Sequence, residues 1–386
     1  MLKKNFLLCT HGTFHYFNLA KALNKKKKLF KIVSGFPYFK LKRFKLNKSL
    51  IQSTGFYQSL NFILRKIGFN QNSNILNIVN WQSSLVVDKN SSRFVNDADI
   101  FLSLSGGGLK TGKKFIEQNK IYICERASSH ILYALKILRK EYAKYGIHFD
   151  IQKRFVDREI EEYKTATFVL VPSKFVQKTF ENEGFFNTKV LSYPSDSKVF
   201  YKLNSIFNEK YKSDKFKIIF VGGLSLRKGV PYLLDAFNQL KFENKELHLI
   251  GSISNDYKLF KNKIKSDNIY VYGHLDQRKI NKLLNSCHLF VMPSIEEGAA
   301  ISVAQAMNTG LPVIVTENTG WKEIVQKYKT GYVVPIMNSK KIAEKINYLN
   351  KNKNLLKRFS TNSIKYSKNK SWDNYVDDLN NLIKTI

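Results

Sequence analysis

The stretch Ser294-Ile-Glu-Glu-Gly-Ala-Ala-Ile-Ser-Val-Ala-Gln-Ala-Met-Asn-Thr-Gly310 follows an apolar run, His288-Leu-Phe-Val-Met-Pro293. The run predicts a buried strand, and the stretch predicts an acidic loop followed by a helix that ends at Gly310. A helix start of this kind points backbone N–H groups at a ligand and favours phosphate. Because the Glu297 carboxylate would repel phosphate, we expect it to accept hydrogen bonds from sugar hydroxyls. The two neighbouring sites together indicate a nucleotide-sugar.

The rest of the chain predicts an α/β protein with parallel sheets. A chain of 386 residues is too long for a single hydrophobic core. Short apolar segments alternate with helical stretches along its whole length. The expected strands are Phe6–Cys9, Lys31–Ser34, Ile100–Ser103, Ile121–Cys124, Phe168–Val171, Lys217–Val221, Leu247–Ile250, Ile269–Tyr272, Leu289–Met292, Pro312–Val315 and Gly331–Val334. We therefore expect two doubly wound domains, with ligands bound beyond the carboxyl ends of the strands.

The expected domain boundary follows from the composition. Residues 202–215 are polar and carry no clear period, which predicts a linker between the domains. The predicted units are an acceptor-side domain over residues 1–201, a donor domain over 202–370 and a terminal helix over 371–386. We expect that helix to begin at Ser371-Trp-Asp-Asn-Tyr375 and to cross back to the first domain.

The net charge of +34 comes from 64 Lys and Arg against 30 Asp and Glu. It limits the classes of partner that the protein is expected to bind. It suits phosphorylated substrates or an anionic membrane face, and a merely solvated surface remains open. The sequence contains no zinc-finger spacing or nucleic-acid motif, so no nucleic-acid partner is expected. No run approaches the roughly 20 apolar residues of a spanning helix. The first ten residues fit a strand better than a signal peptide, so we expect a cytoplasmic location.

The three cysteines, Cys9, Cys124 and Cys287, stand in apolar contexts and are expected to be buried. We expect no metal and no cofactor.

A second loop that follows a strand is Phe220-Val-Gly-Gly-Leu-Ser-Leu-Arg-Lys-Gly229. Gly222 and Gly223 would let the backbone pass close to a ligand. Arg227 and Lys228 follow them. The planar guanidinium of an arginine together with the compact ammonium of a lysine suits a diphosphate. The alternative is a turn that carries two solvated cations.

The helix after Glu297 carries a second candidate side chain. Gln305 lies on the face that turns back toward the helix start, where its amide could bridge ribose hydroxyls; the alternative is a surface residue. Glu296 is expected to be an exposed neighbour.

Two loops of the first half offer weaker candidates. In Thr10-His-Gly-Thr-Phe-His15, Gly12 would let the loop approach a ligand of the partner domain, and the two histidines are loop residues or caps. In Cys124-Glu-Arg-Ala-Ser-Ser-His130, either serine could cap the following helix. We expect His130 in the first helical turn, facing the cleft as a neutral side chain, because the helix dipole disfavours a charged imidazole there.

The glycine-rich Ser105-Gly-Gly-Gly-Leu109 lacks the last glycine of a dinucleotide fingerprint, since Thr111 stands there.

In their order along the chain, these motifs resemble the retaining glycosyltransferases of family 4, also called glycosyltransferases group 1. The resemblance is strongest from Phe220 to Pro335. It rests on the motifs Val-Gly-Gly-Leu…Arg-Lys-Gly, His248-Leu-Ile-Gly251, Pro293-Ser294, Glu297-Gly298 and Gly310-Leu-Pro-Val-Ile314. It implies the GT-B fold, two facing Rossmann-like domains with an inter-domain cleft.

The resemblance also implies roles for single residues. Arg227 and Lys228 would neutralise the leaving diphosphate, a role that metal ions fill in other glycosyltransferases. Glu297 would hold the donor sugar, and His130 would touch it. The remaining donor-binding residues would be Gly12, Gly222, Gly223, Gln305 and the phosphate cradle of Gly298, Ala299, Ala300 and Ile301.

The chain departs from the family pattern at two places. The family motif has a second Glu where Gln305 stands, and an amide can still bond a ribose diol, so donor binding is expected to persist. Tyr193-Pro-Ser-Asp196 replaces a glycine-bearing turn and leaves the hinge geometry open.

The resemblance predicts a hexosyl- or related glycosyltransferase that is retaining and metal-independent. It would move a sugar from a nucleotide diphosphate to a hydroxyl of a glycan or lipid-linked acceptor in cell-surface polysaccharide or lipopolysaccharide biosynthesis. A peripheral location on the inner membrane face would suit the charge. The rivals are a nucleotide-sugar epimerase on the same fold and a non-catalytic basic protein that binds membrane or nucleic acid.

Overall fold

The structure is a computed structural model that describes residues 4–69, 73–368 and 370–386. Its N-terminal domain contains β1 (Phe6–Thr10), α1 (Tyr16–Lys25), β2 (Leu29–Ser34), α2 (Tyr38–Leu41), η1 (Lys42–Phe44), η2 (Lys48–Leu50), β3 (Ile51–Ser53), α3 (Phe56–Lys66), α4 (Asn74–Ser91), η3 (Ser92–Phe94), β4 (Ile100–Leu104), α5 (Leu109–Glu117), β5 (Ile121–Glu125), α6 (Ile131–Ala143), α7 (Lys153–Thr165), β6 (Phe168–Val171), α8 (Lys174–Glu181) and β7 (Thr188–Val190).

The second half of the chain repeats this alternation. It contains α9 (Asn204–Glu209), η4 (Lys210–Lys212), β8 (Phe216–Val221), α10 (Val230–Asn238), β9 (Lys245–Ile250), η5 (Asn255–Leu259), η6 (Lys261–Lys263), β10 (Ile269–Gly273), α11 (Gln277–Ser286), β11 (Leu289–Met292), α12 (Ile301–Asn308), β12 (Val313–Thr316), α13 (Lys322–Tyr328), β13 (Gly331–Val334), α14 (Ser339–Lys351), α15 (Lys353–Ser367) and α16 (Trp372–Lys384).

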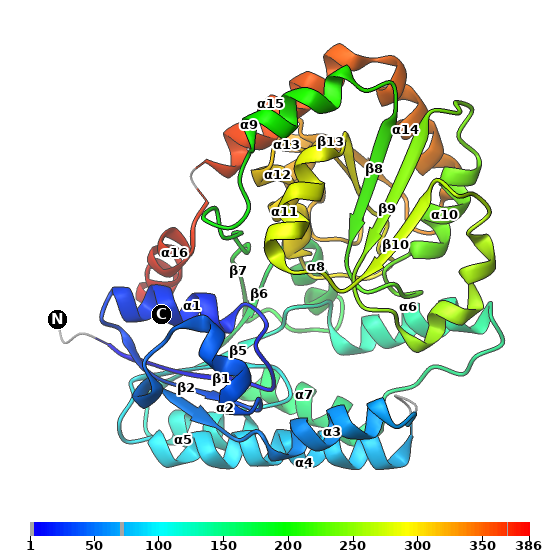
Figure 1. The fold of residues 1–386 in the computed structure, drawn as a ribbon. Helices are drawn as coiled ribbons and strands as arrows, with labels where there is room; N and C mark the ends of the chain where they lie inside the picture. The colour runs from blue at the N-terminus through cyan, green and yellow to red at the C-terminus, as the bar shows by residue number, and fades with distance from the viewer. Residues whose placement is uncertain (1–3, 70–72, 369) are drawn as a thin grey trace.

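Both sheets are parallel and doubly wound (Figure 1). The N-terminal order is β3-β2-β1-β4-β5-β6-β7, and the C-terminal order is β10-β9-β8-β11-β12-β13. The order reverses between β1 and β4 and again between β8 and β11, the points where such sheets bind ligands. The predicted fold of two Rossmann-like domains is confirmed. The sequence analysis missed β3 and β7, because each has only three residues and no apolar run.

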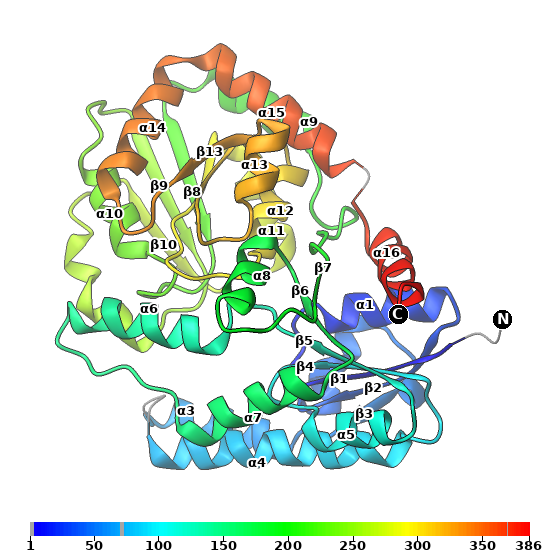
Figure 2. The ribbon, with the colours of Figure 1, turned by 180° about the vertical axis from the view of Figure 1, so that it is seen from behind.

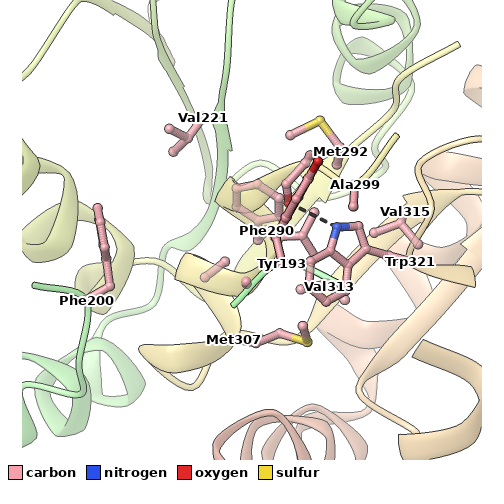
Figure 3. Packing of buried hydrophobic residues seen from close by; sticks show 14 of the residues in the cluster. Tyr193, Phe200, Val221, Phe290, Met292, Ala299, Met307, Val313, Val315 and Trp321 are labelled. Carbon is pink, nitrogen blue, oxygen red and sulfur yellow. Dashed lines mark hydrogen bonds between the residues drawn. The ribbon is translucent and has the colours of Figure 1, made fainter. Parts of the chain in front are cut away.

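The central strands are buried on both faces, which explains their apolar composition. Every residue of β1, β4, β8, β11 and β12 except Lys217 is buried, since helices cover both sides of each sheet. Figure 3 shows the C-terminal core, in which the indole of Trp321 lies beside Ala299 and Val313. The three cysteines are buried and free, as predicted. Over the described ranges, the helices lack the combination of length and apolar character that crossing a bilayer requires.

The stretch predicted as a linker is folded onto the C-terminal domain. Residues 204–212 form α9 and η4, with Phe207 buried, and the Lys210 carbonyl lies 2.9 Å from Nε2 of His288. The chain crosses between the domains earlier, in the irregular segment 191–203. The linker prediction was wrong because a helix with one buried aromatic residue leaves almost no periodic signal.

The last helix brings the chain back to the N-terminal domain. Figures 1 and 2 show α16 lying along α1, and ion pairs of Lys25 with Asp373 and of Lys26 with Asp377 join the two helices. The hydroxyl of Ser371 caps α16 by accepting from the Asn374 N–H. Two separate crossings of the chain therefore set the relative position of the domains.

Candidate functional site

A buried carboxylate joins the loops that follow β5 and β11. Glu296 is 1% exposed, and its Oε1 accepts from the Ser129 N–H (2.8 Å) and from the hydroxyls of Ser128 and Ser129. Its Oε2 accepts from the Arg227 guanidinium at 3.1 Å. The Glu296 side chain therefore links the N-terminal domain to the Arg227 loop.

The prediction that Glu296 is an exposed neighbour was wrong. The hydroxyls that enclose it come from Ser128 and Ser129, far away in the sequence, and only the approach of the domains supplies them. Burial by itself would raise the pKa of Glu296. The Arg227 guanidinium and the serine hydrogen bonds outweigh burial and lower this pKa to about 2.

Three of the predicted site residues lie together beside Glu296. Lys228 forms an ion pair with Glu297, and the Arg227 Nη2 lies 3.6 Å from the same carboxylate. Burial, reinforced by the nearby guanidinium, lowers the pKa of Lys228 well below its usual range. Arg227 and Lys228 thus face the carboxylates of Glu296 and Glu297, and this pairing offsets part of the cost of burying ionisable groups.

Gly298 is required by a close approach of the other domain. A Cβ at this position would lie 1.9 Å from the carbonyl oxygen of Ala127. The Gly298 carbonyl also accepts from the Ser173 hydroxyl at 2.8 Å. Gly298 is predicted from the sequence only as part of a phosphate cradle, and the constraint from the N-terminal domain has no signal in the local sequence.

The start of α12 leaves its first N–H groups without a side-chain cap. The N-cap residue is Ala300, whose carbonyl accepts from the Trp321 indole at 3.0 Å. Ala299 and Ala300 are buried, while Ile301 and Gln305 are half-buried on the helix. An uncapped helix start of this kind can donate to an anion.

Beside the loop after β8, two backbone segments approach closely at Gly251, which directly follows β9. Gly251, at φ +146°, would place a Cβ 1.8 Å from the Gly222 carbonyl, whereas a Cβ on Gly223 would have no neighbour closer than 3.6 Å. The loop is tied to α6, because Asp256 accepts from the Leu226 N–H (2.7 Å) and from the Tyr142 hydroxyl (2.9 Å).

His130 was predicted to face the cleft, but its side chain is enclosed within the N-terminal domain. Its ring is fully buried against Tyr163, Phe180 and Phe185. It caps α6 itself, its Nδ1 accepting from the Leu132 N–H at 3.4 Å, so the predicted serine cap was also wrong. Burial lowers the pKa of His130 to about 4, and the ring is neutral. An enclosed ring offers no atom to a ligand in this structure.

The Gly12 loop packs within its own domain. The Gly12 carbonyl accepts from the Ser34 hydroxyl at 2.8 Å, and the nearest atom to a Cβ there would be in the Phe14 ring, at 3.3 Å. The nearby close approach is at Gly35, where a Cβ would lie 2.4 Å from the His11 carbonyl.

The hinge turn that replaces the family's glycine is anchored by a buried tyrosine. Tyr193 donates its hydroxyl to Glu125, whose Oε1 also lies 2.7 Å from Nε2 of His15. The His15 ring stacks on Trp372 at the start of α16. One buried cluster therefore joins β5, α1 and both crossings of the chain.

The glycine-rich loop after β4 is occupied by a side chain of the same domain. Glu162 accepts from the Gly106 and Gly108 N–H groups, the second at 2.8 Å. Glu162 therefore satisfies two backbone N–H groups of this loop from within the same domain.

Comparison with known proteins finds glycosyltransferases among those similar to this chain. An uncharacterized glycosyltransferase of Methanocaldococcus jannaschii is 31% identical over 41% of this chain and 45% of its own length. The capsular polysaccharide biosynthesis glycosyltransferase CapM of Staphylococcus aureus is 28% identical over 43% and 46%. The chain thus spans about half the length of the curated relatives it matches.

Solved structures match over the whole chain. Crystal structures of HepE from Anabaena with UDP and with UDP-glucose superpose with TM-scores of 0.71 and 0.70. They are 13% and 15% identical; the first covers 100% of both chains, and the second covers 99% of this chain and 100% of HepE. At this identity the likeness concerns the fold alone.

The fold is that of the GT-B class, two facing doubly wound domains joined at the carboxyl ends of their sheets. Residues 202–366 match the family model of the glycosyl transferases group 1. The C-terminal domain of this chain is therefore similar to that family over the matched residues.

The contact at Gly298 predicts the effect of adding one methyl group. Gly298→Ala would push the Ala127 carbonyl away, so we expect the domains to separate and the Tm to fall by about 2–8 °C. Small-angle X-ray scattering should show a larger radius of gyration. Gly223→Ala is the control, since its Cβ has room. An unchanged radius for Gly298→Ala would contradict the contact.

The lowered pKa of Glu296 predicts a dependence of stability on pH. The folded pKa of about 2 lies below the ordinary 4.5, so the ionised side chain stabilises the fold above about pH 4.5. This contribution, about 3 kcal/mol at most, is lost as the pH falls toward 2. The Tm advantage of the wild type over Glu296→Gln should therefore shrink between pH 5 and pH 2. The exposed Glu323→Gln is the control, and an advantage constant with pH would refute the assignment.

Proposed function

We propose that this protein is a retaining, metal-independent glycosyltransferase. It would move a sugar from a nucleotide diphosphate to a hydroxyl of a glycan or lipid-linked acceptor. The family match of its C-terminal domain and the UDP and UDP-glucose bound by HepE support a nucleotide-sugar donor. The capsular polysaccharide relative supports a place in cell-surface polysaccharide biosynthesis.

The observation that carries the proposal is the set of paired charges at Arg227, Lys228 and Glu297. A donor diphosphate would replace the Glu297 carboxylate as the partner of the two cations. Glu297 would then be free to accept hydrogen bonds from the donor sugar. Charge that develops on the leaving diphosphate would meet cations already in place, and this electrostatic stabilisation lowers the barrier.

Glu296 has a different part in this proposal. Its carboxylate stays bound to Ser128 and Ser129 and keeps the Arg227 loop against the N-terminal domain. It acts through Arg227 and is a positioning residue. The retaining stereochemistry rests on the family resemblance, and we assign no nucleophile.

The phosphate cradle of Gly298, Ala299, Ala300 and Ile301 is supported by the uncapped start of α12. The half-buried Gln305 would bridge ribose hydroxyls one turn further along. We place the enzyme in the cytoplasm, at the inner face of the membrane, where its charge of +34 favours anionic lipid.

Turnover with a panel of UDP-, GDP- and ADP-sugars tests the proposal. We expect release of nucleoside diphosphate from one donor, and a loss of about a hundredfold or more in Arg227→Ala and Glu297→Ala. Arg358→Ala, on the exposed side of α15, is the matched control. Isomerisation of the donor sugar without release of nucleoside diphosphate would identify an epimerase instead. If no sugar nucleotide of the panel binds the protein, the proposal is refuted.

Gln305→Glu tests the departure from the family motif. A carboxylate can accept from the same ribose diol, so we expect kcat/KM to stay within about tenfold, which corresponds to about 1.4 kcal/mol. Steady-state kinetics with the active donor measures this. Complete loss would show that the neutral amide is essential beside Glu297.

A further inference from the structure

The helix α3 is turned with its polar side toward the protein. Its one fully buried residue is Asn61, whose side chain donates to Asn80 of α4 at 2.6 Å. Gln58 of α3 donates to the hydroxyl of Ser83, also on α4, at 3.2 Å. Amphipathic helices of globular proteins normally pack with the opposite orientation.

The apolar side of α3 consequently faces outward. Phe56, Ile63 and Ile67 are spaced by seven and four residues and lie on one side of the helix, with Phe62 on its flank. Phe39 of α2 is also exposed. We call these five residues the α2–α3 face, and each of them is more than half exposed.

Contacts between the two helices make this face one surface. Lys40 of α2 lies over the Phe62 ring, 4.2 Å from its centroid. At the start of α3, a Cβ on Gly55 would lie 2.3 Å from the Pro37 Cα, directly before α2. Figure 1 shows the two helices beside each other on the N-terminal domain.

The segment of the chain that carries this face has charge of a single sign. Residues 1–87 contain 15 Lys and Arg, and the first acidic residue of the chain is Asp88. Lys42, Arg43, Lys45 and Lys48 follow Phe39 and are exposed, and Arg65 and Lys66 are exposed at the end of α3. A surface of exposed aromatic and aliphatic residues ringed by cations fits an interface with anionic lipid.

The α2–α3 face begins next to the loops that follow the N-terminal strands. The Thr54 N–H, shortly before α3, donates to the Ser34 carbonyl at 2.8 Å. A Cβ on Gly35 would lie 3.3 Å from Gln58 of α3 and 2.4 Å from the His11 carbonyl. A bilayer under this face would therefore lie close to the edge of the domain that meets the Arg227 loop.

We propose that the α2–α3 face docks on an anionic lipid bilayer, with the aromatic and aliphatic side chains entering the headgroup region. Its role in presenting a lipid-linked acceptor rests on the proposed function, but the docking itself does not. A second copy of this chain is a poor partner, because it would bring the same positive charge to the interface. The lipid bilayer supplies both apolar contact and negative charge.

Vesicle co-sedimentation of the full chain tests this docking. We expect binding to phosphatidylcholine vesicles that contain phosphatidylglycerol, and at least tenfold weaker binding to phosphatidylcholine alone or in high salt. The variant Phe56→Ser/Ile63→Ser/Ile67→Ser and the variant Lys42→Gln/Arg43→Gln/Lys45→Gln should each bind at least tenfold less. Their Tm should stay near that of the wild type, because the altered side chains are exposed.

Matched controls separate this face from the general charge. Lys340→Gln/Lys351→Gln/Lys365→Gln removes three exposed charges from the C-terminal domain, and Phe186→Ser/Tyr348→Ser removes exposed rings elsewhere. If the face variants bind like these controls, the proposal is overturned. It is also overturned if the apolar variant changes only a dimer seen by size-exclusion chromatography. Vesicle binding without donor turnover would refute the proposed function and leave the docking supported.

Discussion

The buried carboxylate of Glu296 is the interaction that joins the N-terminal domain directly to Arg227. It is buried and ionised, and it takes its partners from both domains: Ser128 and Ser129 on one side, Arg227 on the other. A buried charge that loses one partner is strongly unfavourable. The backbone contact of Gly298 with Ala127 adds a steric requirement at the same place. The same contacts therefore set both the approach of the domains and the position of the Arg227 loop.

The link between the domain contact and the Arg227 loop matters for function because it fixes the two basic side chains at the domain junction. Arg227 and Lys228 are balanced by carboxylates, so the positive charge is held in place before any ligand arrives. A diphosphate would exchange partners with these cations and would not have to assemble them. Glu296 would keep its serine partners throughout that exchange. The hinge cluster of His15 and Glu125 fixes the other end of the same domain junction.

Much of the fold could be predicted because parallel strands buried on both faces leave apolar runs in the sequence. The missed elements, β3, β7 and α9, are short and carry little apolar pattern. For the site, the sequence brought Arg227, Lys228 and Glu297 together, and the structure places them in contact. It misplaced Glu296 and His130, because the surroundings of a side chain depend on segments far away in the chain. The inverted orientation of α3 was equally invisible to a reading of periodicity.

The sequence by itself determined the alternation of strands and helices, the loops after β8 and β11 and the strong positive charge. Each is a local or compositional property, set by apolar spacing, by glycine or by side-chain type. Only the tertiary structure decided which acid is buried between the domains, which glycines allow close approach and which side of α3 faces outward. These depend on the desolvation and steric contact that arise when distant segments meet. No single stretch of the chain contains that information.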